Sequence, residues 1–164
     1  MNIAMLREQL KIDEGVKYEV YEDHLGYKTF GIGHLVTAKD PEYTFKVGHK
    51  ISETRVNEAF DNDVSLYIKE AKKVFSNLEK LPEEAQQVIV NMCFNMGAPR
   101  LEKFKKFISA INNEDYETAA IEMLDSRWAN QVGDRAVRLS KRISAIPFKE
   151  NSNYFNNEYM KYNK

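Results

Sequence analysis

The sequence has few of the features that cross-link a chain, anchor it in a membrane or attract it to a polyanion. Its 164 residues include one cysteine, Cys93, so no disulfide can form within the chain and a reducing compartment is permitted. No apolar run is long enough to cross a membrane, which argues against stable membrane insertion. The formal net charge of −1 argues against general electrostatic binding to nucleic acid.

Signatures of metal and nucleotide sites are also missing. The three histidines His24, His34 and His49 lack zinc-like spacing, and the cysteine stands alone. Neither a G-x-x-x-x-G-K-[ST] loop nor a G-x-S-x-G elbow is present, so nucleotide hydrolysis and serine-hydrolase chemistry have no support. We therefore predict no cofactor and no metal.

The composition that remains is typical of a globular protein, with 43% hydrophobic and 30% charged residues. The length fits one folding unit with two lobes better than two independent domains. The N-terminal stretch carries Arg7, Glu8 and Lys11 and lacks the apolar segment of a secretory signal, which predicts a protein made and kept in the cytoplasm.

Helical periodicity covers most of the chain. Asn2 is expected to cap a first helix that ends near Glu14 and has an apolar stripe of Ile3, Leu6 and Leu10. Ser52 is expected to cap a long helix over 52–75, which would span on the order of 30 Å. A helix of that length can join two lobes.

The later helices are expected to be shorter, and one of them is expected to be buried on all sides. Pro82 and Gly97 bound a helix that is apolar nearly all round, which predicts a central buried helix containing an inert Cys93. Asp115 and Asp134 are expected to cap two further helices. Brief connections between these amphipathic helices predict a helical lobe.

One stretch has the pattern of a β-hairpin rather than a helix. The runs 16–21 and 27–32 have β-like composition, with Val16, Tyr18 and Val20 alternating inward, and they flank a turn at Gly26. Gly31 and Gly33 weaken the returning run unless another backbone or a ligand must approach closely. The segment that follows, up to residue 51, is expected to be a loop with at most a short third strand.

Two carboxylates accompany this hairpin. Glu14 lies where the exposed carbonyls of a helix end disfavour negative charge, and Asp23 lies in the turn. A pair of acids beside an open face suits cleavage of a glycosidic bond, in which one acid protonates the leaving oxygen and the other activates water or stabilises a developing oxocarbenium charge. A surface glutamate and a turn aspartate on a glycine-containing hairpin would show the same pattern.

Five ordered motifs carry a resemblance that is more specific than this pair. They are Asp13-Glu14-Gly15, Asp23 before Gly26-Tyr27, Thr29 with Gly31-Ile32-Gly33-His34-Leu35, Asn91-Met92-x-Phe94-x-Met96-Gly97, and Ser126-Arg127-Trp128-x-Asn130-Gln131. The chain resembles the lysozymes of tailed bacteriophages, closest to the T-even type, from about residue 1 to 146. These are endolysins that cleave the bacterial cell wall.

The resemblance implies an endo-acting muramidase that hydrolyses the β-1,4 bond between N-acetylmuramic acid and N-acetylglucosamine of peptidoglycan, with inversion. By position, Glu14 is then the general acid, Asp23 the partner carboxylate and Thr29 a residue that helps to hold the water. The resemblance also places Leu35 and Phe94 along the substrate groove.

The resemblance further implies an α+β, mostly α, lysozyme-like fold with two lobes, and a structural pair between His34 and Asp63. The small β lobe would cover 15–51, the connecting helix 52–75, and the helical lobe 1–14 with 76–164. Trp128 is interpreted as a core anchor. The basic residues of the last helix are interpreted as a solvated face or as a contact for glycan or peptide carboxylates; they are Arg135, Arg138, Lys141 and Arg142.

The implied partner is peptidoglycan, and the implied state is a monomer that reaches the wall after a holin permeabilises the inner membrane. The chain departs from these relatives in its net charge, since T-even lysozymes are strongly basic, and in a shorter connection over 37–51. Two other interpretations share the pattern. One is a catalytically weak glycan-binding protein, and the other is a lytic transglycosylase that uses the same acid without water.

Overall fold

The computed structural model describes residues 1–148, which fall into two compact units that divide between Lys103 and Phe104. Helices dominate and a small antiparallel sheet lies near the N-terminus, so the predicted α+β, mostly α class is confirmed. The tail of the predicted helical lobe, 149–164, lies outside the described residues. The division into lobes at 15–51 and 52–75 stays a prediction.

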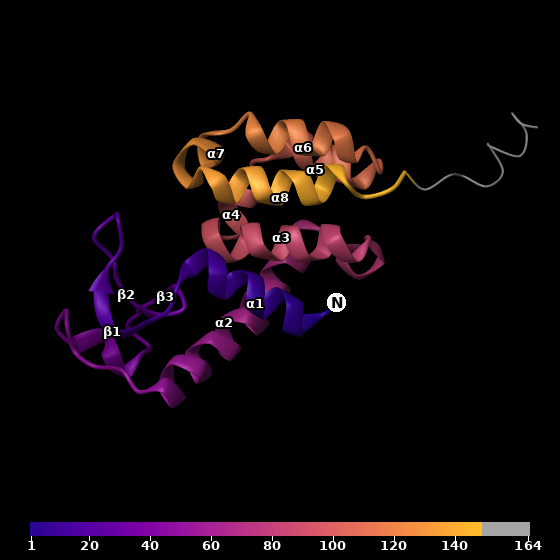
Figure 1. The fold of residues 1–164 in the computed structure, drawn as a ribbon. Helices are drawn as coiled ribbons and strands as arrows, with labels where there is room; N and C mark the ends of the chain where they lie inside the picture. Colours follow the sequence, from indigo (N-terminus) through magenta and orange to yellow (C-terminus); the bar gives the residue numbers. More distant parts are fainter. Residues whose placement is uncertain (149–164) are drawn as a thin grey trace, which may run out of the picture. The chain divides into compact units, whose positions relative to one another are not determined.

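Among residues 1–148, the first unit contains all the strands and the longest helix (Figure 1). Its elements are α1 Ile3–Glu14, β1 Lys17–Glu22, β2 Lys28–Gly31, β3 His34–Leu35, η1 Pro41–Thr44, α2 Glu53–Val74, η2 Leu78–Lys80, α3 Glu83–Met96 and α4 Ala98–Leu101. The second unit contains α5 Lys105–Asn112, α6 Tyr116–Leu124, α7 Arg127–Val132 and α8 Asp134–Ser144.

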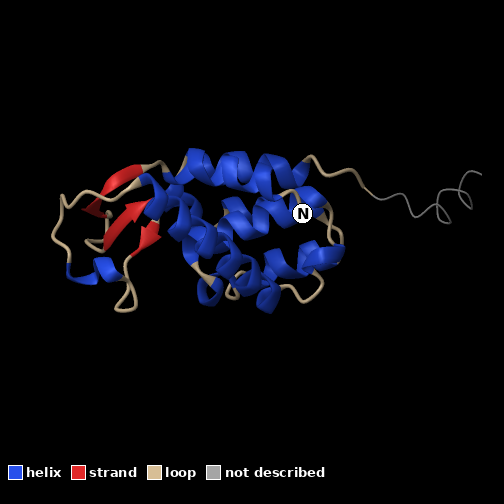
Figure 2. Cartoon of the chain, turned by 90° about the horizontal axis from the view of Figure 1, so that it is seen from below, coloured by secondary structure: helices blue, strands red, loops and turns tan. Residues whose placement is uncertain are grey.

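The sheet has the order β1-β2-β3, and Figure 2 shows its strands side by side. An irregularity between Lys17 and Tyr21 breaks the expected alternation of β1. Val20 is fully buried as predicted, but Val16 and Tyr18 are exposed, so two of the three expected inward residues were wrong. The third strand also comes earlier than expected, directly after Gly33.

Helix α2 begins beside the sheet and continues to α3, as Figure 1 shows. The hydroxyl oxygen of Ser52 accepts the backbone N–H of Arg55 at 3.1 Å, which confirms the predicted cap. At its start α2 lies against β2, where a Cβ on Gly31 would be only 3.0 Å from a methyl carbon of Val56. Gly31, which was predicted to allow a close approach, therefore allows helix α2 to pack closely on the sheet.

Helix α3 is the buried centre of the first unit, because eleven of its residues, including Cys93, are shielded from solvent. Burial raises the pKa of the Cys93 thiol to about 12, so the thiol stays uncharged at neutral pH. Helix α1 packs on α3 through Leu6 and Leu10, which are fully buried, whereas Ile3 is exposed and does not belong to the predicted stripe.

The second unit has its own core around Trp128, which is 1% exposed and lies edge-on to Phe104 at 6.4 Å between ring centroids. The predicted cap at Asp115 is confirmed by a 3.1 Å bond from the Thr118 N–H. Asp134 proves to be the first residue of α8 rather than its cap. Arg135 is buried, so the expectation of a fully solvated basic face on α8 is wrong at that residue.

Candidate active site

Glu14 is the last residue of α1, and the backbone shape after it leaves room for its carboxyl group. The helix ends because Gly15 takes a positive φ of 72° and its N–H bonds to the Lys11 carbonyl at 2.9 Å. The half-buried Glu14 side chain then lies against Gly33, where a Cβ would be 2.7 Å from Oε2. Only glycine at 33 leaves space for the acid in this position.

Hydrogen bonds to α3 hold both ends of α1. Near the N-terminus, the Gln87 amide donates to the Asn2 carbonyl at 2.7 Å and Glu83 accepts the Asn2 N–H. Next to Glu14, the buried Asn91 amide donates to Oδ2 of Asp13 at 2.8 Å. The last turn of α1 is therefore fixed on the most buried helix of the unit.

Asp23 shapes the turn between β1 and β2. Its Oδ1 accepts the backbone N–H groups of Leu25 and Tyr27, each at 2.9 Å, and its own N–H bonds to the Tyr27 carbonyl. These hydrogen bonds explain why an aspartate is found where the hairpin reverses, and they hold its carboxylate in a defined orientation at the end of the strand.

A row of three side chains crosses the sheet next to this turn. Tyr21 pairs with Thr29, and Thr29 pairs with Leu35, so the three residues share one face of β1, β2 and β3. Thr29 is buried and its hydroxyl donates to the Tyr27 carbonyl at 3.0 Å. Leu35 is 47% exposed.

Tyr21 connects this row with the two acids. Burial raises the pKa of its phenol, and the negative charges of Glu14 and Asp23 raise it further. Both carboxylates must lie near one hydroxyl group to have this effect. Tyr21 was not predicted as a site residue, although the spacing Tyr21-x-Asp23 at the end of a strand places both residues on one side of the hairpin.

The predicted pair of His34 and Asp63 is present, with Nδ1 of His34 2.7 Å from Oδ2 of Asp63. The opposite ring nitrogen, Nε2, lies 3.0 Å from Oδ2 of Asp40, a partner in the segment that was expected to be a loop. Burial lowers the pKa of His34, but its bonds and attraction to the two carboxylates outweigh burial and raise the pKa above its ordinary value. Its structural role stays a prediction.

A second charged cluster, also missed, continues from Asp40. Arg55 of α2 binds Glu42 through two guanidinium nitrogens, contacts Asp40 at 3.3 Å and reaches Glu58 at 2.9 Å. The pKa of Glu42, which is 3% exposed, is lowered by Arg55. The cluster ties the 37–51 segment to the start of α2. Sequence spacing could indicate only the pair of Arg55 with Glu58, three residues apart on one helix, and not the pairs with Asp40 and Glu42.

Phe94 lies in the core rather than on an open surface. It is 6% exposed, and its ring is 5.1 Å from that of Tyr67 and 6.1 Å from that of Phe60. The exposed Leu35 is accessible to a ligand as it stands. Contact of either residue with substrate stays a prediction.

The model of the Phage lysozyme family matches residues 11–145, which include every residue of this site. The chain belongs to the phage lysozyme family. It is 32% identical to "Probable T4-type lysozyme 2" and 31% identical to "Probable T4-type lysozyme 1", both of Dictyostelium discoideum. Those comparisons cover 90% and 84% of this chain and 98% and 92% of the relatives. "Peptidoglycan hydrolase gp36" of Pseudomonas phage phiKMV is 23% identical over 84% of this chain and 15% of that protein.

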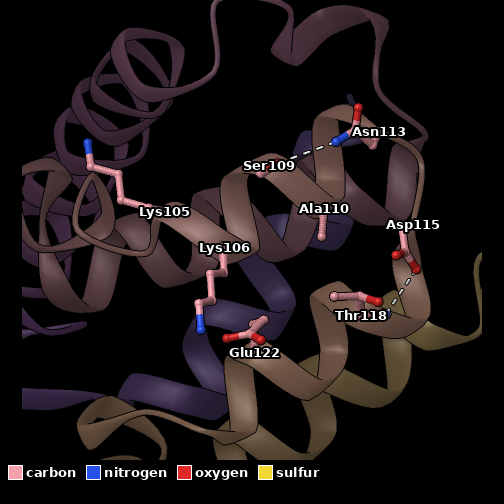
Figure 3. A pocket seen from close by; sticks show the side chains of 8 residues that line it. All are labelled: Lys105, Lys106, Ser109, Ala110, Asn113, Asp115, Thr118 and Glu122. Atoms are coloured by element: carbon pink, nitrogen blue, oxygen red, sulfur yellow. Dashed lines mark hydrogen bonds between the residues drawn. The ribbon is translucent and has the colours of Figure 1, made fainter.

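This phage lysozyme also has a pocket of about 370 Å³ between α5 and α6 of its second unit (Figure 3). Lys105 and Lys106 come from α5 and Glu122 comes from α6, and Figure 3 shows the side chains of Lys106 and Glu122 next to each other. Other polar lining groups serve the helices themselves, since the Asn113 amide bonds Ser109 at 3.3 Å and Asp115 caps α6. None of the residues predicted for the active site lines this pocket.

Residues 1–148 lack two further features. That part of the chain contains no group of histidine, cysteine, aspartate and glutamate side chains arranged to hold a metal ion. Nor does any helix within it combine the length and the apolar character needed to cross a bilayer.

Proposed function

We propose that this phage lysozyme is an inverting muramidase that hydrolyses the β-1,4 bond between N-acetylmuramic acid and N-acetylglucosamine of peptidoglycan. The observation that carries the proposal is that Glu14, packed against Gly33 at the end of α1, and Asp23, fixed in the turn of the hairpin, both lie near Tyr21 of β1, whose pKa their charges raise. Family membership supports the same chemistry, and one relative is named as a peptidoglycan hydrolase.

In the proposed reaction, protonated Glu14 donates its proton to the glycosidic oxygen as the bond to C1 breaks. Asp23 accepts a proton from a water molecule that attacks C1 from the opposite side, which inverts the anomeric centre. The backbone bonds to Oδ1 of Asp23 fix the direction of this carboxylate. Thr29, which lies beside Tyr21 on the same face of the sheet, helps to hold the attacking water.

The first test is Glu14→Gln, which keeps the size of the side chain and removes the proton. We expect the release of reducing ends from purified peptidoglycan to fall by about two to four orders of magnitude, with an unchanged unfolding midpoint. Glu8→Gln is the matched control, because Glu8 is exposed on the same helix and pairs only loosely with Lys11 at 3.5 Å. Near-normal hydrolysis by Glu14→Gln would contradict the assignment.

Product analysis separates the proposal from the other interpretations. An α-configured reducing sugar at early times indicates inversion, whereas an anhydro-muramic product indicates a lytic transglycosylase. Binding to walls by the unaltered protein without any new reducing ends indicates a glycan-binding protein.

We further propose that the protein acts as a monomer and reaches the wall from the cytoplasm of a bacterial host once a holin has opened the inner membrane, causing lysis. Expression with and without a holin tests this route, since lysis should require both proteins.

A further inference from the structure

The geometry points to Tyr21 as a further substrate-binding residue, whose phenol hydroxyl donates a hydrogen bond to an oxygen of the glycan strand beside the cleaved bond. This inference rests on the proposed function and adds a residue to the same site. The register of the sheet gives its first support.

The sheet has two faces with different neighbours. Phe30 pairs with His34, and both contact α2, because the Arg55 guanidinium lies 5.5 Å from the centroid of the fully buried Phe30 ring and His34 bonds Asp63. The alternate row, Tyr21 with Thr29 and Leu35, takes the opposite face. Tyr21 thus stands directly beside the threonine proposed to hold the water.

The ring of Tyr21 is held by a charged neighbour on its own strand. The Lys17 ammonium lies 4.2 Å from the ring centroid, so it covers one face of the ring. The side chain is half-buried.

That hydroxyl has no hydrogen-bond partner among residues 1–148 in the structure, in contrast to the hydroxyl of Thr29. A neutral phenol is both a donor and an acceptor, and sugar hydroxyls, ring oxygens and acetamido carbonyls all accept. A tyrosine phenol already holds its proton at neutral pH, and the raised pKa extends this donor state further into alkaline solution. The two carboxylates whose charges act on this phenol are the proposed acid and base, so the hydroxyl lies in the same part of the molecule as the proposed reaction.

Tyr21→Phe removes only this hydroxyl. On soluble peptidoglycan strands free of cross-links we expect KM to rise about three- to tenfold, with kcat within about twofold because the lost bond holds ground state and transition state alike. Tyr43→Phe is the matched control, since Tyr43 is 56% exposed in η1 and loses the same group. It should keep wild-type KM.

A second measurement separates binding from turnover and from folding. In the Glu14→Gln background, Tyr21→Phe should weaken co-sedimentation with purified walls by a similar factor, while its unfolding midpoint stays at that of the background protein. An unchanged KM and unchanged wall binding would overturn the inference, as would a loss of kcat at constant KM. If Glu14→Gln itself remained active, the proposed function would fail whatever Tyr21→Phe showed.

Discussion

The carboxyl group of Glu14 lies on the backbone of Gly33, so closely that a Cβ at position 33 would be 2.7 Å from Oε2 and 3.0 Å from Cδ of the acid. Gly33 also has a positive φ of 63°. Two separate physical requirements, free space and a left-handed backbone, therefore select glycine at this point of the chain.

Gly33→Ala should displace the acid. The left-handed backbone costs about 1–2 kcal/mol with a Cβ, and the side chain of Glu14 must move, so we expect wall hydrolysis to fall by roughly 100-fold. Gly48→Ala is the control, because Gly48 has a φ of 91° and a Cβ there would meet nothing within 4 Å. It should lose similar stability and keep activity. Equal activity losses in the two variants would argue against a positioning role for Gly33.

Asn91→Ala should loosen the turn that carries the acid. The change removes the 2.8 Å bond to Asp13 from a fully buried site and leaves a cavity, so the free energy of unfolding should drop by about 1–3 kcal/mol. Hydrolysis should also slow, because Glu14 follows Asp13 directly. Urea titration and reducing-end assays measure the two effects. Asn113→Ala, at an exposed helix end, should change stability by less than about 0.5 kcal/mol.

The bonds of His34 predict a pH dependence of stability. Because its pKa is raised in the folded protein, its contribution is complete below the unfolded value of about 6.5 and is lost as pH rises through the folded value. Asp40 has a lowered pKa, so its contribution is complete above the ordinary aspartate value and is lost as pH falls through the folded value. The interaction between His34 and Asp40 therefore stabilises the folded protein most in mildly acidic solution, between these two pKa ranges.

Urea unfolding between about pH 5 and pH 9, a range that brackets the ordinary histidine pKa, checks this expectation. The free energy of unfolding should fall with rising pH in the wild type, and His34→Gln should flatten that fall. His24→Gln, at an exposed turn position, should keep the wild-type slope. A wild-type slope in His34→Gln would show that other groups cause the pH dependence.

Arg55→Met should be strongly destabilising. It leaves the carboxylate of Glu42, which is 3% exposed, without its bidentate partner, and loss of one member of such a pair typically costs about 3–5 kcal/mol. Arg55→Lys should restore only part of the lost free energy of unfolding, because an ammonium group cannot make the two parallel bonds of the planar guanidinium group. Lys73→Met, which breaks the exposed pair with Glu70, should leave the unfolding midpoint unchanged within error.

Capping residues show how much of the fold could be predicted locally. Asn2, Ser52 and Asp115 act as predicted, because a cap is a bond between residues two or three apart. The strand β1 was predicted less well, since its irregularity depends on how β2 and the segment near Lys50 pair with it. Alternation of Val16 and Tyr18 gives no sign of that pairing.

The charged clusters mark the limit of this kind of prediction. Asp40 and Glu42 fall in the segment that was expected to be a loop, and Arg55 falls in the expected helix 52–75. Their bonds cross 13 to 15 positions and join a loop to a helix, so neither periodicity nor local spacing contains them. Tyr21 escaped notice for a related reason, because only the pairing of β1 with β2 sets it beside Thr29.

The order of the amino acids alone establishes the class of the protein, its helices and their caps, and the ordered motifs that carry Glu14 and Asp23, because these depend on periodicity and on bonds between near neighbours. Packing in three dimensions decides how closely Glu14 approaches Gly33 and which carboxylates surround His34. It also brings Glu14 and Asp23 near enough to Tyr21 for both charges to raise the pKa of its phenol. Those relationships join separate elements, and their energies depend on distance and burial, which exist only once α1, the hairpin and α2 have packed together.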